Sequence, residues 1–401
     1  MKKVLIAYNF MMIGGSTTSL LSILNGLDYS QYQVDLLLLY SDPKVSPLIT
    51  QIPPNVNILP QALPFLSKKE EKIYKLTHIR SLATILKTRY LAKHPKDYPL
   101  EHTQLLNIEN ARISRKLDDM YDVAIAFVET WAMYYVAKYV NARKKIGWFH
   151  PDYKSAGFNP KIDNPYFSKF DTIVLVSNKC KDSFDQAFPS LSKHTTCIEN
   201  ILSQSVIRKR AEESISNEIV DDNRKIKAVT TARITFYSKG LDRVVNALEL
   251  CTNKGLLDRN NPSVLWYVIG DGPDYEKMKM MVKQKQLEDI VIMLGKKDNP
   301  LPLEKLCDCF ILPSRYEGKP MAVTEAMMLG LPAIVTNYAS AEEQISQGID
   351  GVIFDNSDEG CIDLVKYLIE NSDKIIQMKK NTLDRDYSNT GELDKIITLL
   401  Q

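Results

Sequence analysis

Short apolar runs, each followed by a stretch of helical character, recur from one end of this 401-residue chain to the other. In the first half, the candidate strands are Val4–Tyr8, Val34–Tyr40, Val123–Phe127, Lys145–Phe149 and Thr172–Val176. In the second half, they are Lys227–Thr231, Val264–Ile269, Val291–Leu294, Phe310–Pro313, Ala333–Thr336 and Gly351–Phe354. Strands that alternate with helices form parallel sheets with helices on both faces. The sequence therefore predicts an α/β protein with two Rossmann-like domains.

The length of the chain also favours two domains, because a single hydrophobic core rarely serves so many residues. The best boundary lies near Asn200, since a polar and charged stretch over 208–222 separates it from the next candidate strand. We expect an N-terminal domain over residues 1–200 and a C-terminal domain over 201–385. An amphipathic helix is expected within 386–401.

Composition excludes several classes of protein. The formal net charge of +2 argues against a strongly basic nucleic-acid-binding protein. The six cysteines are scattered and show neither a disulfide framework nor the C-x2-C spacing of a zinc site. The apolar run at residues 4–8 is too short for a signal peptide and lacks a cleavage motif. We therefore expect a cytoplasmic protein.

Two glutamates in the second half carry the strongest functional signal. Glu317 follows the candidate strand that ends at Pro313, on a loop at the carboxyl edge of the predicted sheet. The residues after Pro320 favour a helix as far as Gly330, which places Glu325 about two turns into it. Ligands of parallel sheets bind at this edge, and the free N–H groups of a helix start suit a phosphate. Two carboxylates beside such a site predict a ligand that has hydroxyls as well as phosphate, such as a nucleotide sugar.

This E-x7-E segment resembles the signature of retaining glycosyltransferases of the GT-B fold, family four (glycosyl transferases group 1), of the bacterial envelope-polysaccharide type. The resemblance implies two Rossmann-like domains with parallel sheets that face each other across a cleft. It implies an acceptor site in the first domain and a donor site in the second, and a last helix that packs back on the first domain. Glu317 would contact hydroxyls of the donor sugar, and Glu325 would contact the ribose. The other donor-binding residues implied in this segment are Gly318, Lys319, Pro320, Met321 and Ala322.

Two cations follow the first strand of the second domain. Arg233 and Lys239, the latter followed by Gly240, resemble the Arg…Lys-Gly element of the family, although their spacing is one residue longer than its commonest form. The resemblance implies that both cations hold the donor pyrophosphate. A departing diphosphate gains negative charge in the transition state, which fixed cations stabilise. We therefore count Arg233, Lys239 and Glu317 among the catalytic residues.

Glycines lie after three of the candidate strands. Gly14 and Gly15 follow the first strand, Gly270 begins a Gly-Asp-Gly-Pro turn, and Gly295 follows Val291–Leu294. A glycine lets a ligand approach the backbone closely. The resemblance implies that all four of these glycines face the phosphates or the nucleotide of the donor.

Glu129 and His150 each follow a candidate strand of the first domain. The segment Trp148-x-His150-x-Asp152 resembles one found in many envelope-polysaccharide members of the family. It implies that His150, as a fourth catalytic residue, contacts the donor sugar or the leaving phosphate, and Glu129 is assigned by analogy to the acceptor. No metal-binding Asp-x-Asp element and no side-chain nucleophile are found at a strand end. The resemblance implies retention without a metal, by front-face attack of an acceptor hydroxyl, and we expect no metal and no cofactor.

The segment 68–96 is rich in lysine and arginine, with apolar residues at roughly helical spacing. A basic amphipathic helix can lie on an anionic membrane surface, but it can equally pack on its own domain. Both alternatives stay open. Contact with the inner face of the plasma membrane would suit an enzyme with a lipid-linked acceptor.

The sequence thus predicts a retaining, metal-independent hexosyltransferase. The donor would be a nucleotide sugar, with a UDP-sugar favoured, and the acceptor a hydroxyl of a glycan or lipid-linked substrate in bacterial cell-envelope polysaccharide synthesis. One alternative is a non-catalytic sugar-nucleotide-binding partner of another transferase. Another is a sugar epimerase or polyol-phosphate transferase of the same fold. The donor sugar, the linkage and the oligomeric state stay open.

Overall fold

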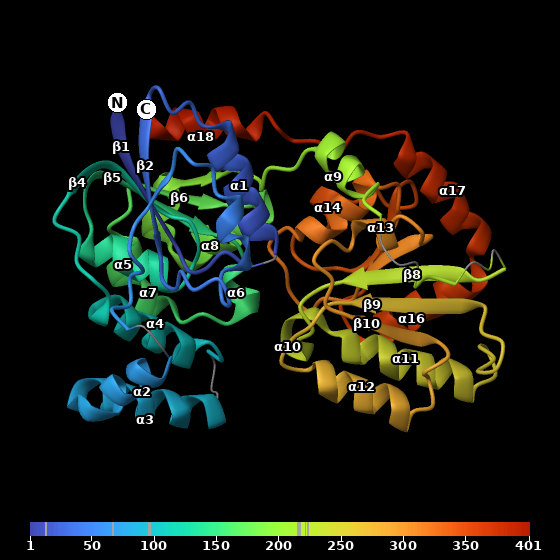
Figure 1. Ribbon diagram of the computed structural model, residues 1–401. Helices are drawn as coiled ribbons and strands as arrows, with labels where there is room; N and C mark the ends of the chain where they lie inside the picture. The colour runs from blue at the N-terminus through green and yellow to red at the C-terminus, as the bar shows by residue number, and fades with distance from the viewer. Residues whose placement is uncertain (13, 66–67, 95–97, 215–217, 221, 223) are drawn as a thin grey trace. The chain divides into compact units, whose positions relative to one another are not determined.

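The computed structural model describes residues 1–401 except 13, 66–67, 95–97, 215–217, 221 and 223 (Figure 1). The chain divides into two compact units. The first unit comprises Met1–Ile201 together with Gly391–Gln401, and the second comprises Leu202–Thr390. Each unit contains one parallel β-sheet with helices on both faces, so the predicted α/β class is confirmed.

The sheet of the first unit has seven strands in the order β3-β2-β1-β4-β5-β6-β7, and every pair is parallel. The strands are β1 Lys2–Tyr8, β2 Tyr32–Leu38, β3 Asn57–Ile58, β4 Met120–Ala126, β5 Asn141–Phe149, β6 Thr172–Leu175 and β7 Thr195–Cys197. The two edge strands, β3 and β7, were not predicted. Both are too short to show an apolar run, so their pairing with a neighbour defines them.

The helix α1 (Gly15–Gly26) and the last helix, α18 (Glu392–Leu400), share a hydrophobic core with one face of this sheet. Ile396 and Leu400 of α18 are buried in that core. Lys144 Nζ donates to the carbonyl of Leu399 (2.7 Å) and Lys2 Nζ to that of Leu400 (3.1 Å), which satisfies carbonyl groups at the end of α18. Helices α5 (Trp131–Tyr139) and α8 (Asn178–Ala187) cover the opposite face.

The remaining helical segments of the first unit are η1 Pro47–Gln51, α2 Lys68–Thr77, α3 Ile79–Lys93, α4 Glu101–Ile113, α5 Trp131–Tyr139, α6 Tyr153–Ala156, α7 Pro160–Phe167, α8 Asn178–Ala187 and η2 Pro189–His194. In Figure 1, α2 and α3 lie outside α4 at the lower edge of this unit. The basic segment that was expected to form one helix is therefore two helices, which meet at His78. Every helix in the described part of the chain is too short or too polar to cross a bilayer.

The sheet of the second unit has six parallel strands in the order β10-β9-β8-β11-β12-β13. They are β8 Ile226–Thr231, β9 Val264–Ile269, β10 Val291–Gly295, β11 Cys309–Leu312, β12 Ala333–Thr336 and β13 Gly351–Phe354. All six coincide with candidate strands within one residue at each end. The four inner strands, β9, β8, β11 and β12, are buried on both faces, so their apolar runs are nearly continuous and easy to recognise.

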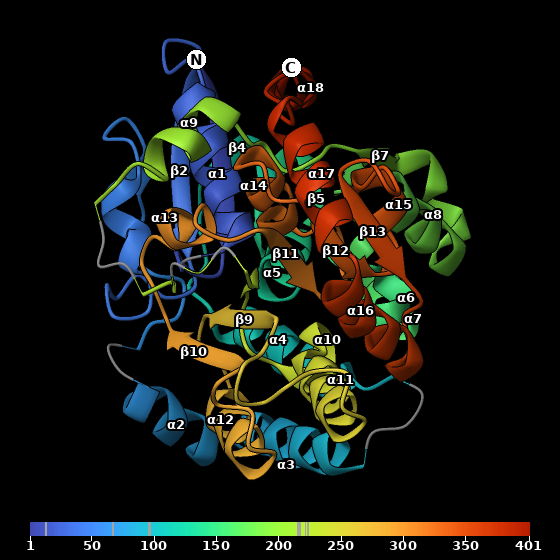
Figure 2. The same ribbon diagram turned by 90° about the vertical axis from the view of Figure 1, so that its right-hand side faces the viewer.

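The helices of the second unit are α9 Gln204–Arg210, α10 Phe236–Lys239, α11 Leu241–Asn253, α12 Tyr275–Gln284, α13 Leu301–Glu304, α14 Met321–Met328, α15 Ala341–Gln344, α16 Asp358–Glu370 and α17 Ser372–Leu383. Figures 1 and 2 show α11 and α12 on one side of β9 and β10, with α13 and α14 on the other. Two separate hydrophobic cores lie on these two faces. The carboxyl ends of β8, β9 and β11 therefore meet at one edge between the helix layers.

Candidate functional site

An ion pair lies at the carboxyl edge of the second sheet. Glu317, on the loop between β11 and α14, accepts hydrogen bonds through Oε1 from Lys239 Nζ (2.5 Å) and from Ser314 Oγ (2.6 Å). The side chains of Glu317 and Lys239 are only 12% and 22% exposed, so water screens the pair weakly. Two residues that are 78 positions apart in the sequence, and that were both singled out from it, are thus brought together.

The backbone around Lys239 explains why a glycine follows it. Gly240 ends the short helix α10 in the left-handed conformation, with φ of +62°. A Cβ atom there would lie 2.3 Å from the carbonyl oxygen of Pro313, so only glycine fits. Arg315 binds both carboxylate oxygens of Asp242 at 2.9 Å. These contacts fasten the loop after β11 to the start of α11.

Arg233 occupies a different position from Lys239. It lies in the loop between β8 and α10, and its side chain is exposed, whereas Glu317 is bound by Lys239 and Ser314. The partly buried cation that contacts Glu317 is therefore Lys239 and not Arg233. Ser314 was passed over as a site residue, although the Pro-Ser step before Glu317 was a signal for it.

The glycine turn after β9 packs tightly on the loop after β8. A Cβ on Gly270, whose φ is +145°, would lie 1.9 Å from the carbonyl oxygen of Ala232. Gly270 N donates to the carbonyl of Gly295 (2.9 Å), which itself has φ of +69°. Gly270 and Gly295, which were both predicted to face the nucleotide, are therefore joined by a hydrogen bond at the same sheet edge.

The helix α14 begins directly after Pro320, and its first turn contains Met321 and Ala322. Gly318 and Lys319 lead into it. The N–H groups in the first turn of a helix have no partner within the helix itself. Glu325 lies about one turn into α14, not the two turns that were expected. Its side chain is half-buried. Burial raises the pKa of Glu325, and the nearby guanidinium of Arg210 opposes the rise.

In the first unit, Glu129 and His150 lie side by side after β4 and β5. Glu129 Oε2 is 3.4 Å from His150 Nδ1 and accepts a hydrogen bond from the backbone N of His150 (3.3 Å). Burial alone would raise the pKa of Glu129, but the His150 ring and the hydrogen bonds outweigh it and hold the pKa below its ordinary value. Neither ring nitrogen of His150 has a well-aligned hydrogen bond within the described residues, and both are shielded from solvent.

Two residues beside this pair were missed in the sequence. Thr130 has φ of +88°, which a β-branched residue rarely adopts. Its hydroxyl accepts a hydrogen bond from Asn9 Nδ2 (3.1 Å), and Asn9 Oδ1 is shielded from solvent with no partner in the described parts of the chain. Backbone strain and unpaired buried polar atoms are common where proteins bind ligands. No sequence pattern marks an unusual φ at a threonine, so neither residue was recognisable.

Gly14 and Gly15 lie where α1 begins, with Gly14 in an extended conformation at the N-cap. A Cβ on Gly14 would meet no atom within 4 Å, so the fold itself does not require glycine there. Asp152, by contrast, has a structural role. Its carboxylate accepts a hydrogen bond from Ser155 N (2.7 Å) and caps the short helix α6.

No group of three or more His, Cys, Asp or Glu side chains in the described residues is arranged to hold a metal ion. A cation, a carboxylate and a helix N-terminus at one sheet edge can instead bind a phosphorylated ligand that carries hydroxyls. Lys239 is the cation of this site, and Glu317 is the carboxylate.

Comparisons with known proteins agree with this chemistry. Residues 211–385 match the model of the family described as glycosyl transferases group 1. The O-antigen biosynthesis glycosyltransferase WclY of Escherichia coli is 27% identical over 186 residues, which cover 44% of this chain and 46% of WclY. The N-acetyl-alpha-D-glucosaminyl L-malate synthase of Bacillus anthracis is 32% identical over 125 residues, 31% of this chain and 30% of that protein. The matched region therefore spans less than half of either relative.

Similarity to solved structures extends over the whole chain. The crystal structure of Anabaena HepE in complex with UDP and glucose superposes with a TM-score of 0.67 at 16% identity, and covers 99% of this chain and 98% of HepE. At this identity, the likeness defines the fold alone. The second unit thus belongs to the glycosyl transferases group 1 family, and the chain as a whole has the GT-B fold.

Proposed function

We propose that this protein is a retaining glycosyltransferase that takes its sugar from a nucleotide-sugar donor bound by the second unit. The observation that carries the proposal is the weakly screened pair of Lys239 and Glu317, which lies at the carboxyl edge of a parallel sheet. The family match over residues 211–385 supports it. In this proposal, Lys239 stabilises the charge that grows on the departing diphosphate, and Arg233 in the loop before it supplies a second, exposed cation.

The remaining donor contacts follow from the same edge. Glu317 would accept hydrogen bonds from hydroxyls of the sugar, and Glu325 from the ribose. The stretch Gly318–Ala322 would hold the diphosphate with the N–H groups of the helix start, and the loops of Gly270 and Gly295 would border the nucleotide. The Gly14–Gly15 turn of the first unit would approach the phosphates.

The first unit is assigned to the acceptor. The carboxylate of Glu129, which is kept ionised beside His150, can accept a hydrogen bond from an acceptor hydroxyl and orient it. The proton of that hydroxyl would pass to the departing diphosphate. The ring nitrogens of His150 are shielded and have no well-aligned hydrogen bond within the described residues, so the ring is suited to contact the sugar or the leaving phosphate. No side-chain nucleophile and no metal enter this scheme.

A UDP-sugar donor and an envelope-glycan acceptor are the specific form of the proposal. Anabaena HepE was solved with UDP and glucose, and the E. coli relative WclY is an O-antigen biosynthesis glycosyltransferase. Incubation of the protein with UDP-sugars should slowly release UDP, with retention at the anomeric centre of the sugar by NMR. A protein that binds UDP without ever releasing it from a sugar would instead be the non-catalytic binding partner. Interconversion of the donor sugar would indicate an epimerase.

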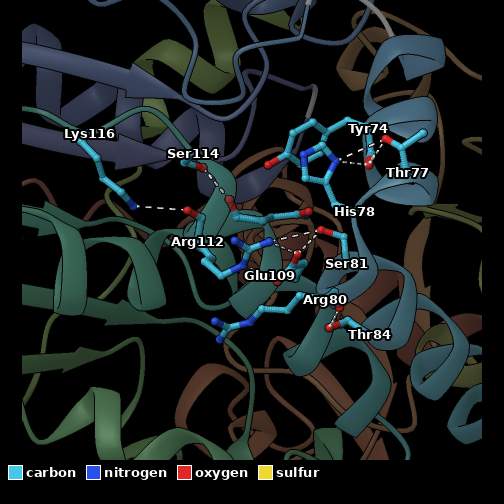
Figure 3. A network of polar contacts seen from close by, with 11 residues as sticks. Tyr74, Thr77, His78, Arg80, Ser81, Thr84, Glu109, Arg112, Ser114 and Lys116 are labelled. Carbon is cyan, nitrogen blue, oxygen red and sulfur yellow. Dashed lines mark hydrogen bonds and ion pairs between the residues drawn. The ribbon is translucent and has the colours of Figure 1, made fainter.

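We further propose that α2 and α3 present a surface that binds an anionic membrane. Beneath this surface, Glu109 of α4 accepts hydrogen bonds from Arg112 Nη2 (2.6 Å) and from Ser81 Oγ of α3 (2.5 Å) (Figure 3). Arg112 Nη2 also donates to Ser81 Oγ (3.2 Å), so Ser81 joins α3 to α4 through both Glu109 and Arg112. Ile73, Leu86 and Tyr90 are more than half exposed, which is unusual for large apolar side chains that lie among so many cations.

The exposed cations of this surface are Lys69, Lys72, Arg80, Lys87, Arg89 and Lys93. Lys96 and the side chains of Lys68 and Lys75 lie outside the described residues. Co-sedimentation with vesicles that contain phosphatidylglycerol should be strong at low salt and weak at high salt. Replacing Leu86 and Tyr90 by serine should weaken it, whereas Ile376→Ser, at an exposed site of α17, should not. If binding does not depend on salt concentration or on lipid charge, the proposal that α2 and α3 bind an anionic membrane is wrong.

A further inference from the structure

A buried carboxyl group that the scheme above does not use lies in the second unit. Glu304 is the last residue of α13, and its side chain is only 1% exposed. One of its carboxylate oxygens, Oε2, is shielded from solvent and has no hydrogen-bond partner within the described residues. Burying an ionised carboxylate without a full set of partners is costly, so such a group is usually protonated, functional or both.

Residues of α14, α9 and β8 lie around Glu304. Glu325 of α14 and Arg210 of α9 are the charged groups that interact with it, and Thr231 at the end of β8 lies beside it with a shielded hydroxyl. The thiol of Cys307 also lies near Glu304, and burial raises its pKa far above the ordinary value. Leu301 of α13 shares a hydrophobic cluster with Met321 and Met328 of α14, so Glu304 lies near the helix that carries the carboxylate we assign to the ribose.

The electrostatics of this cluster favour one proton shared by its two acids. Burial is the main cause that raises the pKa of Glu304 to about 8. The Thr231 hydroxyl lowers it in part, the charge of Glu325 adds to the rise, and Arg210 opposes it. Burial raises the pKa of Glu325 as well, but less. One cation can balance one carboxylate, so the cluster is neutral when Glu304 keeps its proton and Glu325 is ionised.

We propose that Glu304 is a positioning residue of the donor site: as a neutral acid, it keeps Glu325 the single carboxylate that receives the ribose hydroxyls. The protonated carboxyl can donate one hydrogen bond within the cluster, which Glu325 and the Thr231 hydroxyl can accept. Loss of that proton would place a second negative charge beside Glu325, in a site that must also accept a diphosphate. This role rests on the proposed donor site. If Glu304 has this role, nucleotide affinity falls as the pH rises and Glu304 loses its proton. Glu304 need not touch the nucleotide itself.

The first test needs no ligand. Glu304→Gln keeps the size of the side chain and mimics the neutral acid. An acid whose folded pKa is raised contributes stability that is present at low pH and lost as the pH rises through the folded value. The wild type should therefore lose thermal stability relative to the Glu304→Gln variant as the pH rises from about 5 to about 8, and the difference should level off above pH 8. Equal pH profiles for the two proteins would overturn the assignment of a neutral Glu304.

The second test uses UDP as the probe, with affinity measured by calorimetry. If binding needs protonated Glu304, the Kd of the wild type should rise about tenfold from pH 7 to pH 9, whereas that of Glu304→Gln should change less than about twofold. Any titration of UDP itself affects both proteins alike. The matched control Glu249→Gln, which removes the partner of Lys285 on α11, should keep the wild-type slope.

The outcomes separate the two proposals. Binding of UDP with the same pH slope in the wild type and in Glu304→Gln would remove the role of Glu304 and leave the donor site intact. Absence of binding at pH 7 to UDP, GDP, dTDP and CMP alike would overturn the donor site and this role together.

Discussion

The two units place a glutamate at the same point of the same sheet topology. Glu129 follows β4 and Glu317 follows β11, and each of these strands pairs with the first strand of its unit. The strand order reverses direction between these pairs, which is where open parallel sheets bind ligands. The partners of the two acids differ. Glu317 is bound by Lys239, and Glu129 lies beside His150.

The surroundings of the two glutamates differ as well. Around Glu317, the loops are fastened by the Arg315–Asp242 pair and by Gly240, whose position no other residue could fill. Around Glu129, Thr130 has a strained backbone, and His150 has ring nitrogens without hydrogen bonds in the described region. A preformed charged site suits the constant part of a substrate, namely the diphosphate. A site with unpaired polar groups suits the variable part, namely the acceptor.

The largest effect should come from breaking the ion pair of the second unit. Lys239→Ala and Glu317→Ala should each lower kcat by about 10²–10³-fold, the range measured when a group that stabilises transition-state charge is removed. This decrease in kcat can be measured as the rate at which each variant hydrolyses UDP-sugars.

The matched control lies in the same unit. Lys285 and Glu249 form an ion pair of the same length, 2.5 Å, between α12 and α11. Lys285→Ala should leave turnover unchanged. Equal turnover in Lys239→Ala, Glu317→Ala and Lys285→Ala would show that the sheet-edge pair has no part in catalysis.

A smaller loss should follow when the equivalent acid of the first unit is changed. Glu129→Gln removes a charged hydrogen-bonding group, which costs about 1.5–3 kcal/mol, or roughly a ten- to hundredfold decrease in kcat/KM for the acceptor. The hydrolysis of donor without acceptor should change little. If Glu129→Gln impairs donor hydrolysis as strongly as Glu317→Ala does, the division of roles between the units is wrong.

A substitution at Thr130 provides a third test of the different roles proposed for the two units. Its strained backbone costs roughly 1–3 kcal/mol, and glycine would relieve it while losing about 1 kcal/mol through its greater freedom in the unfolded chain. Thr130→Gly should thus keep or raise the free energy of unfolding, but it also removes the hydroxyl that Asn9 binds, and acceptor turnover should fall. Thermal unfolding and turnover are measured on the same preparation.

Gln286 is the control for Thr130, because it is the other described residue besides glycine with positive φ, at +54°, and it lies just after α12. Gln286→Gly should not change turnover. If acceptor turnover is also unchanged in Thr130→Gly, the strain at Thr130 has no role in acceptor binding.

The same contrast explains how much could be predicted from the sequence. The second sheet was recognisable strand by strand, because its inner strands are buried on both faces and form apolar runs, and its edge strands are apolar as well. Lys239 and Glu317 were recognisable because each follows such a run within a motif. Glu304 carries no such signal. It stands in the segment Leu301–Cys307 like an ordinary surface acid, and only the packing of α13 buries it.

The first unit was harder to predict for a different physical reason. Asn9 and Thr130 lie far apart in the sequence, and their relation depends on a backbone angle that residue type does not specify. The division of the basic segment into α2 and α3 was also missed, because the charges and apolar residues continue with the same spacing on both sides of His78. The local sequence pattern therefore predicts secondary-structure elements, but tertiary contacts determine which polar groups are buried.

The smallest effect concerns Asp152, which resembles a family motif but acts as a helix cap in the structure. Asp152→Ala should lower the free energy of unfolding by about 1 kcal/mol, a typical loss for an N-cap, and lower Tm by roughly 2–4 °C. Asp152→Asn keeps an acceptor oxygen and should restore both values.

Ser357→Ala, which removes the cap of α16 in the second unit, should lower the free energy of unfolding by about as much as Asp152→Ala. Turnover should stay within about twofold in all three variants, because a cap stabilises the helix without touching the reacting atoms. A loss of turnover in Asp152→Asn without a loss of stability would instead place Asp152 beside Glu129 and His150 as a third polar group of the acceptor site.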